Sequence, residues 1–299
     1  MIPESYLAPI HEYTDMPFRL LCQEYGAQSV CLPLLNTKAI TNKPKKLGQM
    51  VDISALERSA GVQLVGSDPV LVAKTARLVF ESYPSTEWFN LNCGCPSNNT
   101  VGTGGGSALM RQPQRIADIV AEMKRSVGTP VNVKIRIKES FEETLQMCKT
   151  IESSGIDSLI VHGRTVKAGY SGKADWKMIK LLHEALDIPL IGNGDIQSDR
   201  EGRELVKNGF CDSFMIGRAA MKNPGVFRNE EPDGVRGRRK LLERYIELHE
   251  SHIGPPHPAD VKVKGVNFVS GVPEGAALRD KICRAKTVEE MVNVLADKE

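Results

Sequence analysis

The chain has 299 residues, of which 41% are hydrophobic and 25% charged, enough for one large α/β barrel with a small appendage or for two ordinary domains. Its apolar runs are too short to span a membrane, so we expect a soluble protein with no membrane partner. A net charge of +2 does not by itself indicate a nucleic-acid binder, although local basic patches remain compatible with one.

The N-terminal segment, MIPESYLAPIHEYTD, lacks the features of a secretory signal. Acidic Glu4 stands where such a signal carries basic residues, and the apolar stretch is short. The seven cysteines are an odd number at wide spacings, which does not suit a disulfide framework. No CxxC pair or HxxxH cluster gives zinc-ligand spacing, so no metal site is expected. We predict a cytoplasmic protein, and we expect it to be a monomer.

Short β-rich runs alternate with amphipathic stretches along most of the chain. Helix start signals stand between them at Asp68-Pro69, Gln112-Pro113 and Ser140. This repeated alternation predicts a closed (β/α)8 TIM barrel rather than an open doubly wound sheet. The chemistry of such barrels takes place at the C-terminal ends of the strands. The expected strands are YLAPI (6–10), SVCLPLL (29–35), GVQLVG (61–66), EWFNLNC (87–93), VNVKIRI (131–137), SLIVHG (158–163), PLIGNG (189–194) and SFMIG (213–217).

A change of composition near residue 233 indicates a second unit. Pro232, Asp233 and Gly234 form a turn cluster, and amphipathic segments such as RRKLLERYIELHESH and LRDKICRAKTVEEMVNVLADKE follow it. We therefore predict a catalytic barrel over residues 1–232 and a small all-helical domain over residues 233–299.

The end of the fourth strand, NLNCGCPSNNTVGTGGGSALM (90–110), places two thiols beside a glycine-rich loop. Position alone leaves a ligand contact and a structural role open, because most free cysteines are small buried hydrophobes. Pro96 restricts Cys95 to extended geometry and removes the next N–H, which fixes Cys95 where the strand becomes loop. Cys95 is therefore the stronger candidate for a ligand contact, and Cys93 for a buried role. We expect the glycines to let substrate and cofactor approach closely.

Polar side chains end the fifth and sixth strands. Alternation projects Lys134 and Arg136 to one side, which must be the barrel interior or its mouth. A buried lysine needs an anion or an acceptor, so its partner is a ligand, which we favour, or an internal carboxylate. His162 and Arg164 stand in the same relation on the sixth strand. A lone histidine is more often structural, but a strand end beside Lys134 favours a cofactor role.

The seventh and eighth strands end in glycine-containing turns. Asn193, Gly194 and Asp195 follow the seventh strand, and Gly217 with Arg218 ends the eighth. These two loops form the usual phosphate site of a TIM barrel, where backbone N–H groups and a helix N-terminus receive the anion. Each turn is weak evidence alone, but together they predict a cofactor that carries a phosphate.

Several motifs of the barrel segment occur in a fixed order. They are Ala8-Pro9, Thr14-Asp15 with Phe18-Arg19, Gln63-Leu64, Asn92 with Gly94-Cys95-Pro96, GGGSALM (104–110), Lys134-Ile135-Arg136, His162-Gly163-Arg164-Thr165, Tyr170 with Asp175-Trp176, Asn193-Gly194-Asp195-Ile196 and Gly217-Arg218-Ala219. As a set they resemble the flavin-dependent tRNA-dihydrouridine synthases, a family that joins an FMN-binding barrel to a small C-terminal helical domain. Ile10 and His11 depart from the more usual Met and acidic residue, and Cys93 is a further departure.

The resemblance implies a reaction and a set of site residues. Hydride from reduced FMN reaches carbon-6 of a uracil in tRNA, Cys95 donates a proton to carbon-5, and NADPH or NADH reduces the flavin. A thiol of ordinary pKa, near ~8.5, is mostly protonated at neutral pH and suits this role. Lys134 and His162 stabilise charge on the reduced ring, and Gln63 bonds to the same edge. The other implied flavin contacts are Pro9, Ile10, His11, Asn193, Gly194, Asp195, Gly217 and Arg218, and the implied substrate contacts are Asn92, Arg136, Arg164 and Tyr170.

Basic runs give independent support for an RNA partner. They are NKPKK (42–46), RGRRK (236–240) and the pair Lys262 and Lys264. Charge runs are usually solvated surface, but runs near a barrel mouth and on a helical domain make a track for a phosphate backbone. We expect tRNA contacts from Arg236, Arg238, Arg239 and Lys240.

Two other functions fit parts of the sequence. An FMN barrel that acts on a free pyrimidine, as dihydroorotate dehydrogenases do, has the same cofactor site but needs no basic helical domain. A barrel that binds RNA without catalysis is a second alternative, and Cys95, Lys134 and His162 argue against it.

Overall fold

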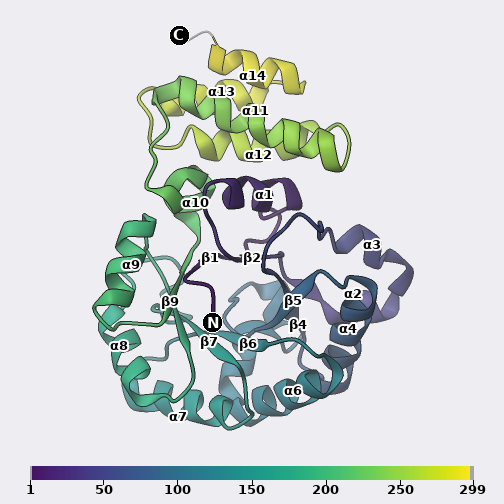
Figure 1. The fold of residues 1–299 in the computed structure, drawn as a ribbon, viewed down its shortest axis with the longest axis vertical. Helices are drawn as coiled ribbons and strands as arrows, with labels where there is room; N and C mark the ends of the chain where they lie inside the picture. The colour runs from purple at the N-terminus through teal and green to yellow at the C-terminus, as the bar shows by residue number, and fades with distance from the viewer. Residues whose placement is uncertain (1, 297–299) are drawn as a thin grey trace.

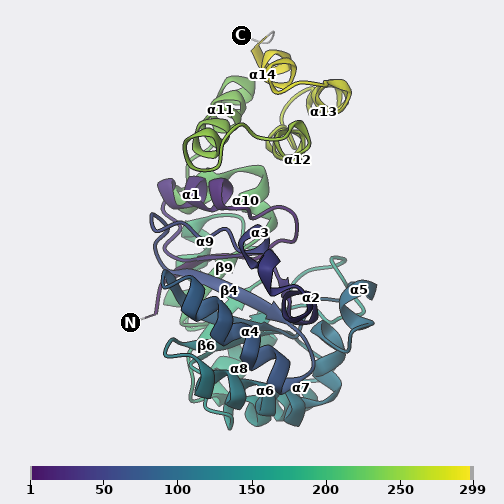
Figure 2. The same ribbon diagram turned by 90° about the vertical axis from the view of Figure 1, so that its right-hand side faces the viewer.

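The computed structural model describes residues 2–296. Met1 of the predicted barrel domain and residues 297–299 of the predicted helical domain lie outside the described part. Strands form a parallel barrel with helices around it, and a group of helices covers one side of that barrel (Figures 1 and 2). Within the described residues, no helix is both long and apolar enough to cross a membrane.

The strands make one nine-stranded parallel sheet with the order β1-β9-β8-β7-β6-β5-β4-β2, and β3 pairs with β4. An isolated parallel bridge between Tyr6 and Ser29 joins the two ends of this order, which closes the ring. The fold prediction of a (β/α)8 barrel is therefore confirmed. The strands are Ser5–Leu7 (β1), Val30–Cys31 (β2), Leu35–Asn36 (β3), Ala60–Val65 (β4), Thr86–Asn92 (β5), Val131–Arg136 (β6), Ser158–His162 (β7), Leu190–Asn193 (β8) and Ser213–Ile216 (β9).

The predicted second strand is wrong in one respect. Residues 29–35 form two short pieces, β2 and β3, rather than one strand. Pro33 lies between them and has no N–H to donate to a ladder, so pairing stops there. Pairing with β4 resumes where Leu35 meets Leu64.

The helices of the barrel begin where the sequence signals stand. Asp68 accepts a hydrogen bond from Leu71 N–H at the start of α4, and Ser140 accepts one from Glu143 N–H at the start of α7. These bonds satisfy backbone donors that a helix N-terminus leaves free. The helices are Met16–Glu24 (α1), Thr37–Asn42 (α2), Leu47–Met50 (α3), Pro69–Ser82 (α4), Asn98–Val101 (α5), Pro113–Ser126 (α6), Phe141–Glu152 (α7), Trp176–Ala185 (α8), Asp199–Lys207 (α9) and Arg218–Lys222 (α10), with 3-10 turns at Pro44–Lys46, Gly106–Arg111 and Pro224–Arg228.

The barrel interior is filled by side chains. Apolar residues from several strands meet inside the ring, so the described part of the barrel has a packed core. Polar side chains take the place of these apolar ones toward the C-terminal strand ends. The interior cluster consists of Tyr6, Ala8, Cys31, Trp88, Ile160, Ile191 and Met215.

Within the described residues, four helices follow the barrel, and the first of them starts one residue after the predicted boundary. They are Gly234–His252 (α11), Pro258–Phe268 (α12), Gly275–Arg284 (α13) and Val288–Ala296 (α14). α11 packs on α1, and α12 packs on α10. Phe18 and Leu21 of α1 belong to the same apolar cluster as Tyr245 of α11 and Phe268 of α12. The helical region is therefore seated on the barrel through a shared core.

Lys264 on α12 is part of this junction and not of a basic surface. Its side chain is 1% exposed, and Nζ donates to Tyr13 O at 2.5 Å and to Asp15 Oδ2 at 2.8 Å. The rings of Tyr13, Phe18 and Tyr245 surround the ammonium group. The expectation that Lys264 adds to an RNA-binding track is therefore wrong, because its charge is paired and buried.

Candidate active site

A cavity of about 770 Å³ lies at the C-terminal ends of the strands. Its wall contains the predicted catalytic cysteine, every predicted flavin contact and three of the predicted substrate contacts. Asn267 of α12 also reaches this wall, so the helical region takes part in the cavity. The predicted residues that line it are Pro9, Ile10, His11, Gln63, Asn92, Cys95, Lys134, Arg136, His162, Tyr170, Asn193, Gly194, Asp195, Gly217 and Arg218.

The two thiols after β5 lie in different surroundings. Cys95 is half-buried and lines the cavity. Cys93 is fully buried in the apolar core between the sheet and the outer helices, and burial raises its pKa above the ordinary range of a thiol. Of the two, Cys95 is thus the sulfur that can meet a ligand.

The glycine-rich loop packs against Cys95 itself. Gly106 has φ +59°, and a Cβ atom there would lie 2.7 Å from Cys95 O and 2.5 Å from Thr100 Cγ2. Ser107 N–H donates to the same Cys95 oxygen at 3.0 Å. The expectation that these glycines make room for substrate and cofactor is wrong, because none of residues 104–106 lines the cavity. Gly106 instead lets the loop close over the backbone that carries the thiol.

Lys134 projects from β6 into the cavity. Its Nζ donates to Asn193 Oδ1 at 2.9 Å, and no described residue forms an ion pair with it. Burial, followed by repulsion from Arg136, lowers its pKa to about 8. The alternative of an internal Lys–carboxylate pair therefore does not hold among the residues that the structure describes.

His162 at the end of β7 holds a neutral imidazole. Burial, together with the charges of Lys134, Arg136 and Arg164, lowers its pKa to about 2. Arg164 Nη1 lies 3.3 Å from His162 Nε2. Because arginine has no acceptor, Nε2 must accept, and the ring proton resides on Nδ1.

Arg164 lies outside the cavity wall and holds the turn that contains Asp195. Its Nη2 donates to both carboxylate oxygens of Asp195 at 2.6 Å, and Arg218 Nη2 reaches Asp195 Oδ1 at 3.1 Å. Burial opposes ionisation of Asp195, but the Arg164 hydrogen bond and an N–H bond from Ala174 lower its pKa below the ordinary value. Arg164 is buried and, unlike Arg136, does not line the cavity, so the structure gives it no open face for the predicted substrate contact.

Arg136 and Tyr170 line the cavity, the first buried and the second exposed. Arg136 donates to the carbonyl oxygens of Gly94, Thr165 and Gly169, and its guanidinium lies 5.6 Å from the Tyr170 ring centroid. Arg218 lies 4.8 Å from the same centroid. Tyr170 is 64% exposed, which leaves part of its ring free for a further planar group.

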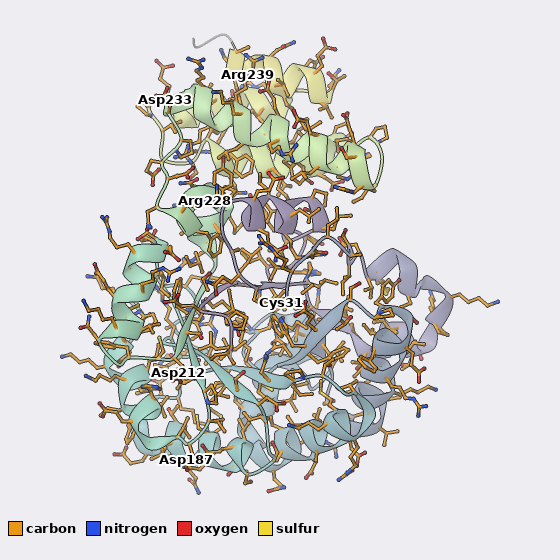
Figure 3. All side chains as sticks on the ribbon, viewed as in Figure 1. Cys31, Asp187, Asp212, Arg228, Asp233 and Arg239 are labelled. Atoms are coloured by element: carbon orange, nitrogen blue, oxygen red, sulfur yellow. The ribbon has the colours of Figure 1, made fainter. Side chains whose placement is uncertain are left out.

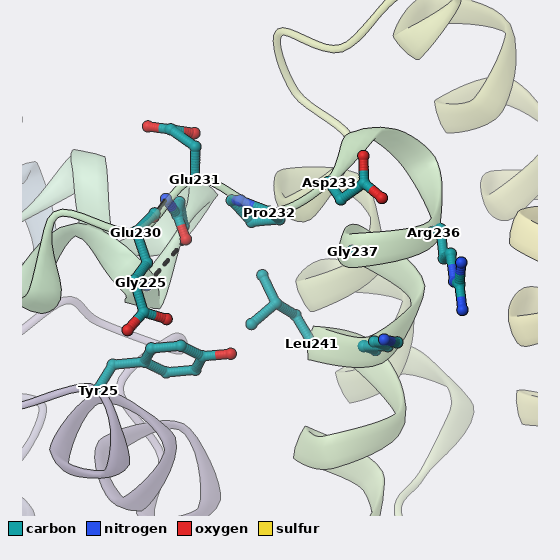
Figure 4. A pocket seen from close by; sticks show the side chains of 11 residues that line it. Tyr25, Gly225, Glu230, Glu231, Pro232, Asp233, Arg236, Gly237 and Leu241 are labelled. Atoms are coloured by element: carbon teal, nitrogen blue, oxygen red, sulfur yellow. Dashed lines mark hydrogen bonds between the residues drawn. The ribbon is translucent and has the colours of Figure 1, made fainter.

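The basic run 236–240 does not form a single charged face. Arg236 and Lys240 are exposed and line a second pocket of about 330 Å³ between α11 and the barrel, where the Arg236 side chain turns away from Tyr25 (Figure 4). Arg239 Nε pairs with Glu243 at 2.8 Å and lies on the helical region, far from Cys31 in the barrel (Figure 3). Arg238 is 8% exposed and donates to Lys222 O. The expected exposed contact from Arg238 is therefore wrong.

Sequence reasoning missed two polar residues inside the barrel. Asn90 and Asn132 are buried; Asn90 accepts a hydrogen bond from the site amide of Gln63 and donates one to Asn132. The signal was present, because Asn90 stands two residues before Asn92, and Asn132 two before Lys134. A period of two puts them on the same inner face.

Comparison with known proteins agrees with this geometry. Residues 6–269 match the family model described as dihydrouridine synthase (Dus). A probable tRNA-dihydrouridine synthase of Aquifex aeolicus is 28% identical over 97% of this chain and 94% of its own length. The tRNA-dihydrouridine synthase B of Shewanella oneidensis is 34% identical over 74% of this chain and 69% of its own. The chain belongs to the dihydrouridine synthase family, which makes it an oxidoreductase and implies a flavin-type cofactor.

Solved structures of lower identity share the fold. A 2-naphthoyl-CoA reductase is 11% identical with a TM-score of 0.58 and covers 75% of this chain. A histamine dehydrogenase from Rhizobium sp. 4-9 is 13% identical with a TM-score of 0.54 and covers 82%. This chain covers 49% of each of those chains, and at these identities the likeness shows the fold alone.

Proposed function

We propose that this protein reduces the carbon-5 to carbon-6 double bond of uridines in tRNA, with FMN as cofactor and NADPH or NADH as reductant. The observation that carries the proposal is the cavity wall, where a thiol on Cys95 faces the same space as Lys134, His162 and Gln63. Family membership and the names of the relatives support the same reaction.

The residues present fit a flavin that carries a phosphate. Lys134, Arg136 and Arg218 bring positive charge to the cavity wall, whereas Asp195 is the carboxylate there and already pairs with two arginines. Such a wall favours an anion. Lys134, His162 and Gln63 would hold the ring edge, and Gly217 with Arg218 and the turn of Asn193, Gly194 and Asp195 would hold the phosphate, with Pro9, Ile10 and His11 along the remaining side.

Reduced flavin would supply the hydride that reaches carbon-6 of the uracil. Cys95 would then transfer its thiol proton to carbon-5, where the electron pair of the former double bond forms the new C–H bond. The resulting thiolate regains a proton from water before the next turnover. Asn92, Arg136 and Tyr170 would hold the uracil, which must leave its stack to reach the cavity, while Arg164 holds the Asp195 turn behind it.

The helical region would hold the tRNA backbone outside the cavity. Arg236 and Lys240 are exposed on one face of α11 because they are four residues apart, and Arg239 lies beside them. Cytoplasmic location and a monomeric state are part of the same proposal, since neither a membrane nor a second copy is needed to complete the cavity.

Purification and a single-turnover assay test this function. The protein should be yellow and carry FMN, and NADPH should bleach the flavin. Addition of unmodified tRNA should then restore its colour and leave dihydrouridine in the RNA. Colourless protein that takes up no FMN contradicts the cofactor, and reoxidation by a free pyrimidine but not by tRNA contradicts the substrate.

A further inference from the structure

Gln63, Asn90 and Asn132 form a row of side-chain amides across three neighbouring strands. Gln63 on β4 pairs with Asn90 on β5, and Asn90 pairs with Asn132 on β6, so the three side chains point to the same face of the sheet. Gln63 Nε2 donates to Asn90 Oδ1 at 2.6 Å, and Asn90 Nδ2 donates to Asn132 Oδ1. Gln63 lines the cavity, whereas Asn90 and Asn132 lie buried behind its wall.

Asn92 joins this row to the loop of the catalytic thiol. Its Oδ1 accepts the backbone N–H groups of Gly94 and Cys95 at 3.2 and 3.0 Å. Because a backbone N–H can only donate, the oxygen of Asn92 must face the loop. Its amide nitrogen therefore faces Gln63 and donates to Gln63 Oε1 at 2.8 Å.

The direction of every amide in the row follows from these two backbone donors. Gln63 turns its oxygen to Asn92 and its nitrogen to Asn90, and Asn90 accepts with its oxygen and donates to Asn132. An amide nitrogen carries two N–H groups, and the row uses one of those on Gln63. Because Gln63 also lines the cavity, its second N–H is available to a ligand there.

We propose that Asn90 and Asn132 are positioning residues that hold the Gln63 amide with its free N–H toward the flavin, in one hydrogen-bonded unit with the Cys95 loop. The inference rests on the proposed function, in which Gln63 contacts the flavin. Without an acceptor at position 90, a buried N–H of Gln63 loses its partner, and only the bond from Asn92 to Gln63 Oε1 is left to hold the amide.

Isosteric variants of Asn90 test this role. Asn90→Leu removes the acceptor with little change of volume. Asn90→Asp keeps an acceptor at this position, because a carboxylate oxygen accepts from Gln63. The Asn132 amide can rotate to donate to the other carboxylate oxygen, and the cations of the cavity offset the negative charge. Ser158→Ala is the matched control, since Ser158 pairs with Asn132 and is buried on the same inner face but takes no part in the row.

Titration of the flavin-free proteins with FMN, followed by quenching of flavin fluorescence, gives the readout. We expect Asn90→Leu to weaken FMN binding about tenfold, the effect of one oriented hydrogen bond, and the other two variants to stay within about 1.5-fold of wild type. If Asn90→Leu does not fold, Asn132→Val is read in its place with an expected loss of about threefold.

Three results would overturn the inference. Wild-type affinity in a folded Asn90→Leu protein means that the row is only structural. Equal losses in Asn90→Asp and Asn90→Leu mean that the acceptor is not what matters. A wild-type protein that binds no FMN contradicts FMN as the cofactor and, with it, the role of Asn90 and Asn132. The first two results differ from this one, because they leave the proposed function intact.

Discussion

Replacement of Lys134 by methionine is expected to stabilise the flavin-free protein while it weakens flavin binding. Burial lowers the Lys134 pKa from 10.5 to about 8, and at 1.36 kcal/mol per unit this corresponds to about 3 kcal/mol against the charged form. Methionine of similar length removes that cost and also the hydrogen bond to Asn193, which is worth about 1 kcal/mol. The expected net gain at pH 7 is about 2 kcal/mol.

The gain depends on pH in a defined direction. Unfolded Lys134 titrates at its ordinary pKa, so between pH 8 and 10.5 the unfolded state binds more protons than the folded state. The stability of the flavin-free wild-type protein therefore rises through this window relative to the variant. Below pH 8 the lysine is charged in both states, and the variant keeps its full advantage.

Urea denaturation of both flavin-free proteins at pH 7 and pH 10 measures this difference. The midpoint of Lys134→Met should exceed that of wild type at pH 7, and the two should converge at pH 10. FMN titration of the variant should show at least a tenfold loss of affinity, because a charge facing the cofactor is gone. A variant that is less stable than wild type at pH 7, or a difference that does not change with pH, refutes the reasoning.

Three further changes separate the roles assigned above. Cys95→Ala should leave FMN binding and reduction by NADPH intact but slow flavin reoxidation by tRNA by roughly 10²–10⁴-fold, the range for a lost general acid. Cys93→Ala should slow reoxidation much less. Stopped-flow absorbance measures both rates, and a larger defect for Cys93→Ala would reverse the assignment. Gly106→Ala should destabilise the protein by about 2–3 kcal/mol, because φ is positive and the new Cβ would contact Cys95 O. Gly155→Ala is the control, since φ is also positive but nothing lies within 4 Å, and it should cost about 1 kcal/mol. Equal melting temperatures of the two variants would show that the loop at Gly106 moves to accommodate the Cβ. The double variant Arg236→Glu/Lys240→Glu should weaken tRNA binding and reduce its salt dependence, while NADPH-driven flavin reduction is unchanged. Lys207→Glu on α9 is the control. Unchanged tRNA binding in the double variant would mean that Arg236 and Lys240 are ordinary surface residues.

The barrel and most of the cavity wall could be predicted because local rules and the global fold agree. The ends of β5, β6, β7 and β8 carry polar residues with a period of two, and a parallel barrel brings all such ends to one face. Lys134, His162 and Asn193 therefore meet although they are far apart in the chain. The division of SVCLPLL by Pro33 was also open to prediction, since a proline cannot donate to a ladder.

Contacts between distant side chains could not be predicted in the same way. A glycine in the sequence indicates that another group approaches the backbone closely, but the sequence does not identify that group. At Gly106 the group is the Cys95 carbonyl rather than a ligand. Asn90 and Asn132 carried the right period, yet an inward asparagine is costly by itself. Its partner in the next strand makes it favourable, and that partner depends on register.

Charge runs mislead for a related physical reason. Lys264 and Arg238 belong to basic segments, but each lies on the inner face of its helix, where burial requires a partner. Lys264 finds Asp15 and the Tyr13 carbonyl on the barrel, and Arg238 finds the Lys222 carbonyl at the end of α10. Both cations thus bond the helical region to barrel segments beside the cavity. The segment bonded by Lys264 follows Ile10 and His11, and Arg238 bonds Lys222; all three of these residues line the cavity. At these two positions the positive charge is paired in the junction between the helical region and the barrel, so it is not exposed for RNA.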